Sequence, residues 1–171
     1  MPGINKEEMY AKFNSRQPQA AQALVEYIGS SSAREGILHF IDWLQAKGVT
    51  PQYADYENQS PVWEVNYRGK AFYLVLNGQD NVCIMGKVAF SEESQAVMRD
   101  NNMEETVLGN LQYCTRKDGG HCGNCDLPAH IAGVDEVIFG QEIKGLCCGQ
   151  FVTFENPGSV VVEGVIKLLE L

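Results

Sequence analysis

Long apolar runs are missing from this sequence, and no stretch approaches the about 20 apolar residues that a membrane-spanning helix needs. The first residues carry charges where a secretion signal has its apolar run. We therefore expect a soluble protein of the reducing cytoplasm with no membrane partner.

Positive charge is scarce as well, with 13 Lys and Arg against 22 Asp and Glu and a net charge of −9. Nucleic-acid affinity depends mainly on clustered cationic side chains, so we expect no nucleic-acid partner. The acidic excess of residues 91–113 is typical of a solvated helix face and loop. The sequence also lacks a phosphate-binding glycine loop, a paired-carboxylate motif and a nucleophile elbow, which argues against an enzyme.

The length of 171 residues and the hydrophobic content of 44% fit one domain, residues 1–171, whose core needs no disulfides. Hydrophobic periodicity divides it into a helical layer (1–48), a β-meander (61–90), a cysteine-rich loop (114–149), and a strand with a C-terminal helix (150–171). This order predicts an α+β fold with an antiparallel sheet of about four to six strands, and with the cysteine loop at one edge.

Three helices are predicted in the first 48 residues, starting at Asn5, Pro18 and Ser32. The third is the clearest, because Ser32 and Glu35 have capping-box spacing, apolar residues recur at helical intervals, and Gly48 supplies a stop. His39 lies beside the apolar stripe, and we expect a boundary residue there, since no other ligand chemistry is near it in sequence.

From Pro61 the apolar period changes to two, which is typical of strands. The predicted strands are Val62–Tyr67, 71–76, 82–85 and 151–154. Arg68-Gly69 and Asn77-Gly78 are the expected turns, and Asn156-Pro157 is expected to start the last helix. We expect the face that carries Trp63 to belong to the core beneath the helices.

Five of the six cysteines lie between residues 114 and 148, and Cys122 and Cys125 have the Cys-x2-Cys spacing of a zinc turn. A structural zinc site needs four thiolate or imidazole ligands at tetrahedral corners, and only one of an adjacent pair fits comfortably. The predicted ligands are Cys114, Cys122, Cys125 and Cys147, with Cys148, His121 and His130 in reserve. An iron–sulfur cluster also uses four cysteines and is the lesser alternative. Cys83 alternates within a strand and is expected to be a buried residue outside the site.

Two other interpretations remain open. A Cys-x2-Cys pair is also the dithiol of thioredoxin-like enzymes, and adjacent Cys147 and Cys148 can chelate soft ions or form a strained disulfide. This would make a thiol-redox or soft-metal-responsive protein, although no βαβ unit surrounds the motif. Alternatively the thiols are idle, and the chain is a metal-free binding protein with a groove lined by Trp63, Tyr67 and Tyr73.

Residues 63–70 (Trp-Glu-Val-Asn-Tyr-Arg-Gly-Lys) precede the cysteine loop, which is followed by residues 139–143 (Phe-Gly-Gln-Glu-Ile), Cys147 and residues 151–157 (Phe-Val-Thr-Phe-Glu-Asn-Pro). Over residues 60–171 this order resembles small uncharacterised cysteine-rich α+β proteins of anaerobic bacteria, which implies a bacterial origin and carries no activity with it. The order of helices, sheet and closing helix is similar to YdhG-like domains, although a fold analogy says little about function. We therefore expect a bacterial module with a structural zinc site that presents a small-molecule or protein-binding surface.

Overall fold

The computed structural model describes residues 25, 28–54, 61–77, 81–114, 133–147 and 150–171. The predicted helices at Asn5 and Pro18, and the turn residues after Asn77, lie outside these ranges. The described elements are α3 (Ser31–Ala46), β1 (Gln52–Ala54), β2 (Val62–Tyr67), β3 (Lys70–Asn77), β4 (Asn81–Lys87), α4 (Glu92–Asp100), α5 (Glu104–Gly109), β5 (Val134–Ile138), β6 (Gln141–Leu146), β7 (Phe151–Glu155) and α6 (Ser159–Glu170).

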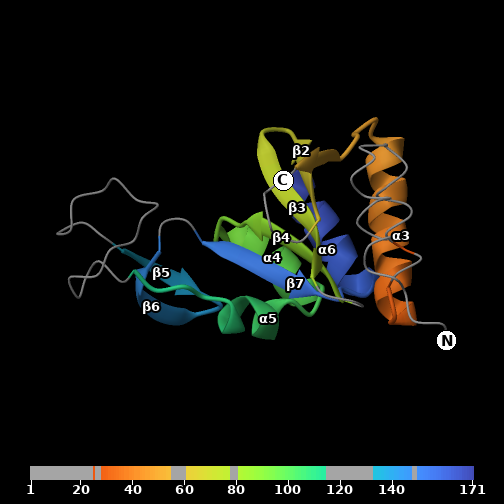
Figure 1. Cartoon of the computed structure of the whole chain (residues 1–171). Helices are drawn as coiled ribbons and strands as arrows, with labels where there is room; N and C mark the ends of the chain where they lie inside the picture. The colour runs from red at the N-terminus through yellow and green to blue at the C-terminus, as the bar shows by residue number, and fades with distance from the viewer. Residues whose placement is uncertain (1–24, 26–27, 55–60, 78–80, 115–132, 148–149) are drawn as a thin grey trace.

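Five strands form one antiparallel sheet in the order β1-β2-β3-β4-β7, and β5 pairs with β6 in a separate two-stranded sheet. The strands β2, β3 and β4 form the predicted meander, whereas β7 returns from late in the sequence to pair with β4 (Figure 1). The sheet and its helices confirm the α+β architecture. No helix in the described ranges has both the length and the apolar character needed to cross a membrane.

Helix α3 begins earlier than its predicted capping box. Ser30 is the N-cap, and its Oγ accepts a hydrogen bond from the backbone N–H of Ala33 at 3.3 Å. Ser32 therefore lies inside the first turn, and the predicted start was wrong because three consecutive serines offer the same capping chemistry. The predicted stop is confirmed, since Gly48 has φ +68° and its N–H donates to the Gln45 carbonyl.

The hairpin of β2 and β3 closes through the two residues that the sequence indicated. Arg68 and Gly69 have φ values of 51° and 78°, as a two-residue type I′ turn requires. The two strands pair with Trp63 opposite Leu74 and Val65 opposite Phe72. The turn thus fixes a register that brings these apolar side chains to one face of the sheet.

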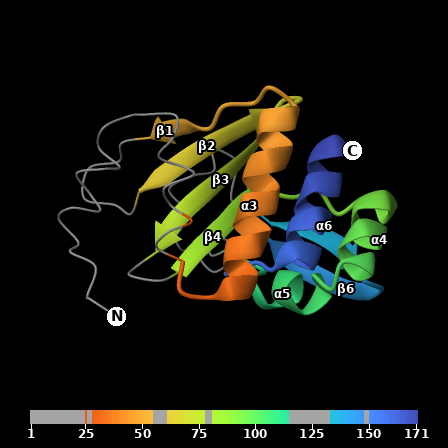
Figure 2. The ribbon, with the colours of Figure 1, turned by 90° about the vertical axis from the view of Figure 1, so that its right-hand side faces the viewer.

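Helices α3 and α6 lie side by side over this face, and α4 packs against α6 (Figure 2). A Cβ at Gly36 of α3 would lie 2.2 Å from the carbonyl oxygen of Pro157, so glycine permits the close approach of α3 to the chain before α6. Helix α6 begins two residues after Pro157, at Ser159. The centre of the core is Ile37, Phe40, Leu44, Trp63, Leu74, Ile84, Phe154, Val165 and Leu169.

The expectation of a loop throughout residues 114–149 was wrong for residues 134–146. Strands β5 and β6 pair there, and Phe139 and Gly140, with φ values of 51° and 81°, form the two-residue turn between them. Most of this hairpin is exposed on both faces, so burial does not impose an apolar alternation on its sequence. A β-bulge near Val134 further disturbs the period.

The hairpin is held to the main body by the buried side chain of Gln95 on α4. The Gln95 amide nitrogen donates to the carbonyl of Val137 at 3.0 Å, and its oxygen accepts from the N–H of Phe139 at 2.6 Å. The Arg99 guanidinium lies over the Phe139 ring, 5.4 Å from its centre. One glutamine thus satisfies two backbone groups at the turn and fixes the hairpin's position.

Candidate functional site

The strand segment that ends at Cys114 pairs with the end of β6. Tyr113 and Leu146 form an antiparallel bridge. The N–H of Cys114 donates to the carbonyl of Gly145, and the N–H of Cys147 donates to the carbonyl of Gln112, each at 2.8 Å. Cys114 is therefore opposite Gly145, and Cys147 is its diagonal neighbour on the same face of the ladder. Two cysteines far apart in sequence thus meet on adjacent strands.

Gly133, where the described chain resumes after residue 114, lies at the same place. A Cβ at Gly133 would be 3.0 Å from the Cα of Gly145 and 3.4 Å from the Cβ of Cys114. Its φ of +91° lies in the region that favours glycine. Cys114 and Gly133, the two described residues that flank residues 115–132 in the sequence, are therefore close together. We call Gln112, Cys114, Gly133, Gly145 and Cys147 the cysteine base.

Part-buried hydrogen bonds hold the cysteine base in place. The Gln150 side chain is 6% exposed; its oxygen accepts from the N–H of Gln112 at 3.0 Å, and its nitrogen donates to the Gln112 carbonyl. On the other strand, the Asp135 carboxylate accepts from the N–H of Gly145 at 2.9 Å. Helix α5 precedes the cysteine base in the sequence. Asn110, directly after this helix, connects it to β7, because its Oδ1 accepts a hydrogen bond from the N–H of Thr153. Sequence reasoning missed these supporting residues, because isolated amides and glycines carry no motif.

The cysteine base contains two of the four predicted zinc ligands. Cys114 is 8% exposed, and Cys147 is half-buried. The other predicted ligands and reserves, Cys122, Cys125, Cys148, His121 and His130, lie outside the described residues. Within the ranges that are described, no group of three or more His, Cys, Asp or Glu side chains has the arrangement of a metal site. The described part of the chain thus places two of the predicted ligands on adjacent strand segments.

Cys83 lies apart from this site, in the main sheet. It is 2% exposed on β4 and pairs in register with Val75 on one side and Glu155 on the other. Burial, with a smaller contribution from the Glu155 carboxylate, raises the pKa of the Cys83 thiol to about 11. A thiol held protonated in this way is a poor nucleophile and a poor metal ligand. The predicted burial of Cys83 is confirmed.

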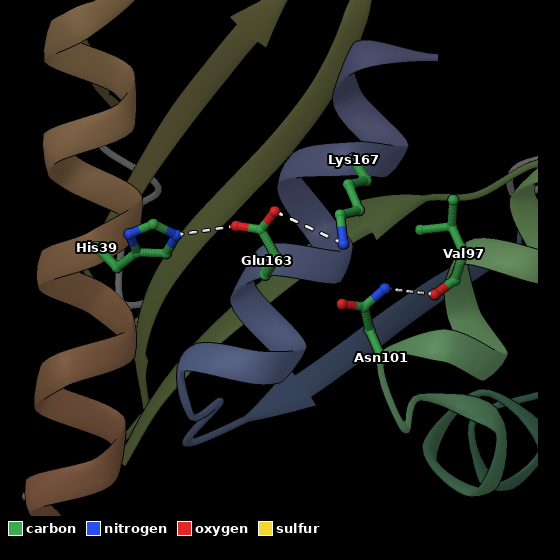
Figure 3. A network of polar contacts seen from close by, with 5 residues as sticks. All are labelled: His39, Val97, Asn101, Glu163 and Lys167. Carbon is green, nitrogen blue, oxygen red and sulfur yellow. Dashed lines mark hydrogen bonds and ion pairs between the residues drawn. The ribbon is translucent and has the colours of Figure 1, made fainter.

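His39 also has the structural position that was expected. Its Nε2 lies 3.1 Å from Oε2 of Glu163 on α6, and Lys167 approaches the other oxygen of that carboxylate at 3.6 Å (Figure 3). Asn101, at the far side of the same open depression, donates to the Val97 carbonyl at 2.7 Å. Of these contacts, the one between His39 and Glu163 joins α3 to α6, and it is an exposed contact of modest strength.

The three aromatics proposed to line a groove do not share a face. Trp63 is 2% exposed in the core, and Tyr67 packs edge-on against Trp43 of α3. Tyr73 pairs with Glu64 and so points to the opposite face, where its ring meets Phe151. The prediction that these three residues line one groove was therefore wrong. Tyr73 is next to Leu74, the residue paired with Trp63, and adjacent residues of a strand point to opposite sides of the sheet.

A pocket of about 490 Å³ does lie at the end of the sheet where β3 starts and β4 ends. We call it the sheet-end pocket; its principal lining residues are Lys70, Phe72, Lys87, Val88, Phe151 and Leu168. The sequence did not single out either lysine, because they come from different strands and only the sheet register brings them together.

Comparisons with protein-family models, curated proteins and solved structures find no match to this chain. The resemblance to small cysteine-rich bacterial proteins therefore stays a prediction, and the function is argued from the residues themselves.

Proposed function

We propose that the cysteine-bearing segment binds one zinc ion as a structural centre. Cys114 and Cys147 would hold the metal from the cysteine base, and Cys122 and Cys125 would complete the shell. The observation that supports this is the backbone pairing of Gln112 and Cys114 with Cys147 and Gly145, which makes the two cysteines diagonal neighbours. Diagonal positions on a ladder are about 7 Å apart at Cα, a separation that a metal between two thiolates can bridge.

The covalent length of the chain permits the remaining two ligands to reach the base. Cys122 follows Cys114 by eight residues, and Cys125 precedes Gly133 by eight residues. An extended chain advances about 3.3 Å per residue, so either arm is long enough to leave the base and return to it. The two ends of the segment meet at one place, which lowers the entropy lost when the metal closes the loop.

Four cysteine ligands leave no open coordination position, so such a centre stabilises structure and does not activate water or substrate. The ordered segment would lie beside the β5–β6 hairpin, whose exposed apolar side chains include Val134 and Val137, with Tyr113 next to it. We propose that the metal centre shapes this end of the molecule as a surface for a small-molecule or protein partner.

The test is the zinc content of protein purified without chelators, compared among matched cysteine-to-alanine variants. We expect about one zinc per chain for the wild type and for Cys83→Ala, and loss of most of the metal for Cys114→Ala and Cys147→Ala. Cys148→Ala should retain zinc, because Cys147 is assigned to the shell.

Wild-type protein with well under one equivalent of metal and with Cys114, Cys122, Cys125 and Cys147 freely titratable would contradict the proposal. A reversible disulfide between Cys122 and Cys125 in metal-free protein with an unchanged fold would instead favour the thiol-redox alternative. Zinc retained by Cys147→Ala and lost by Cys148→Ala would reject Cys147 as the fourth ligand.

A further inference from the structure

The sheet-end pocket has the composition of a small-molecule site. It shares no lining residue with the cysteine base. Its volume of about 490 Å³ falls in the range of pockets that enclose a ligand of drug-like size. Phe72, Val88, Phe151 and Leu168 give it a largely apolar wall. Phe72 and Val88 are themselves buried parts of the core, so this wall exists before any ligand arrives.

The charged side chains of the pocket are cationic, although the chain as a whole is acidic. The charged side chains that line the pocket are Lys70 and Lys87, and no Asp or Glu side chain is among the described lining residues. The whole protein, in contrast, carries a net charge of −9. Phe72 pairs with Gly86, so Lys70 at the start of β3 and Lys87 at the end of β4 lie at the same end of the sheet, and both line the pocket there.

The two ammonium groups differ in what they already bind. Lys70 Nζ donates to the carbonyls of Leu168 and Leu169 at the C-terminal end of α6, which leaves one of its three protons for another acceptor. Lys87 is exposed, and within the described chain its ammonium has neither a hydrogen bond nor an ion pair. The pocket therefore offers one fixed and one adjustable cationic donor.

We propose that the sheet-end pocket binds a small organic monoanion, with one carboxylate on an aromatic or branched aliphatic body. The carboxylate contacts the lysine ammonium groups, and the body fills the space among Phe72, Val88 and Phe151. A single negative charge is favoured over a phosphate, because the C-terminal end of α6 at this pocket carries a partial negative charge that opposes a dianion.

The first test uses anilinonaphthalene sulfonate, a fluorescent monoanion with an aromatic body, in competition with phenylbutyrate and with its neutral counterpart phenylbutanol. We expect one site per chain, displacement by phenylbutyrate, and much weaker displacement by the alcohol. Equal displacement by acid and alcohol would overturn the proposal, because charge would then play no part in binding.

Matched charge reversals locate the site. Lys87→Glu should weaken binding of the probe about tenfold, because it replaces an attraction with a repulsion. Lys144→Glu, an equally exposed lysine on β6, should leave the affinity unchanged. Equal effects of the two variants would show that the probe responds only to net charge, and would overturn the assignment.

A chemical-shift titration of the wild type with phenylbutyrate gives an independent readout that needs no variant. Shifts should concentrate on the backbone amides of Gly69, Lys87, Val88 and Phe151, and shifts concentrated elsewhere would reject the pocket. Binding should persist after zinc is removed by a chelator, since the pocket belongs to the main sheet. Failure of the metal proposal and failure of the pocket proposal are thereby distinguishable.

Discussion

Cys114 and Cys147 are diagonal neighbours on two hydrogen-bonded strand segments, joined through the N–H of each to a carbonyl on the other strand at 2.8 Å. Gly133 lies next to Cys114. The two residues that flank the cysteine-bearing segment 115–132 are therefore close together. The hydrophobic core is centred between the main sheet and helices α3 and α6, and it reaches the cysteine base through Leu146. Most of the buried core side chains lie apart from the two cysteines, so we expect the core and the cysteine-bearing segment to differ in what stabilises them.

This separation predicts that metal removal loosens one segment and spares the rest. After chelation, we expect limited proteolysis to cut first between residues 115 and 132, while far-UV circular dichroism keeps its helical signal. Cys83→Ala protein treated in the same way is the control, and it should behave as the wild type. Cooperative loss of all secondary structure on chelation would show that the metal supports the core as well.

Gln150 is predicted to be a supporting residue for the cysteine base. Gln150→Ala removes the acceptor of the Gln112 N–H and one of the two donors to the Gln112 carbonyl, which keeps its hydrogen bond from the N–H of Cys147. The loss of two hydrogen bonds should lower the free energy of unfolding by about 1–3 kcal/mol. Gln141→Ala, at an exposed position on β6, should change it by less than about 0.5 kcal/mol. Urea unfolding measures both, and similar effects of the two substitutions would contradict the supporting role.

Gly86 is predicted to be required by the ring of Phe72. A Cβ at this position would lie 2.4 Å from two ring carbons, and Phe72 is buried in the core. Gly86→Ala should therefore destabilise the protein by about 1–3 kcal/mol through overpacking. Gly109→Ala is the matched control, since a Cβ there has nothing within 4 Å, and it should be neutral or stabilising by up to about 1 kcal/mol. A neutral Gly86→Ala would mean that the ring moves aside at no cost.

The raised pKa of Cys83 predicts a loss of stability at high pH. In the unfolded chain the thiol ionises near its ordinary value of 9.0, whereas in the fold it stays protonated up to about 11. Between these values the unfolded state binds fewer protons, so the free energy of unfolding falls as pH rises, by at most about 1.4 kcal/mol per pH unit. Cys83→Ala should remove this part of the slope.

Urea unfolding of both proteins at several pH values from 8 to 11 separates this effect from other titrations, which the two proteins share. Parallel pH profiles would contradict it. In native protein at neutral pH, Cys83 should also be the slowest thiol to be alkylated, which mass spectrometry can follow.

Local patterns in the sequence were sufficient for much of the fold. The alternation of Val62–Tyr67, the Arg68-Gly69 turn and the helical stripe before Gly48 each specify an element through neighbours in sequence, and the structure confirms them. The β5–β6 hairpin was missed because its exposed faces impose no apolar alternation, and its Phe139-Gly140 turn lacks the usual Asn or Asp.

The sequence by itself determined three features of the protein: a cluster of cysteines, an excess of acidic residues, and the apolar alternation of its strands. Only the tertiary structure decided which of them meet. Cys114 and Cys147 become neighbours through backbone hydrogen bonds, and Lys70 and Lys87 share a pocket because β3 and β4 are paired. Backbone groups are the same in every residue except proline, so such long-range pairings leave no pattern of side chains from which they can be predicted.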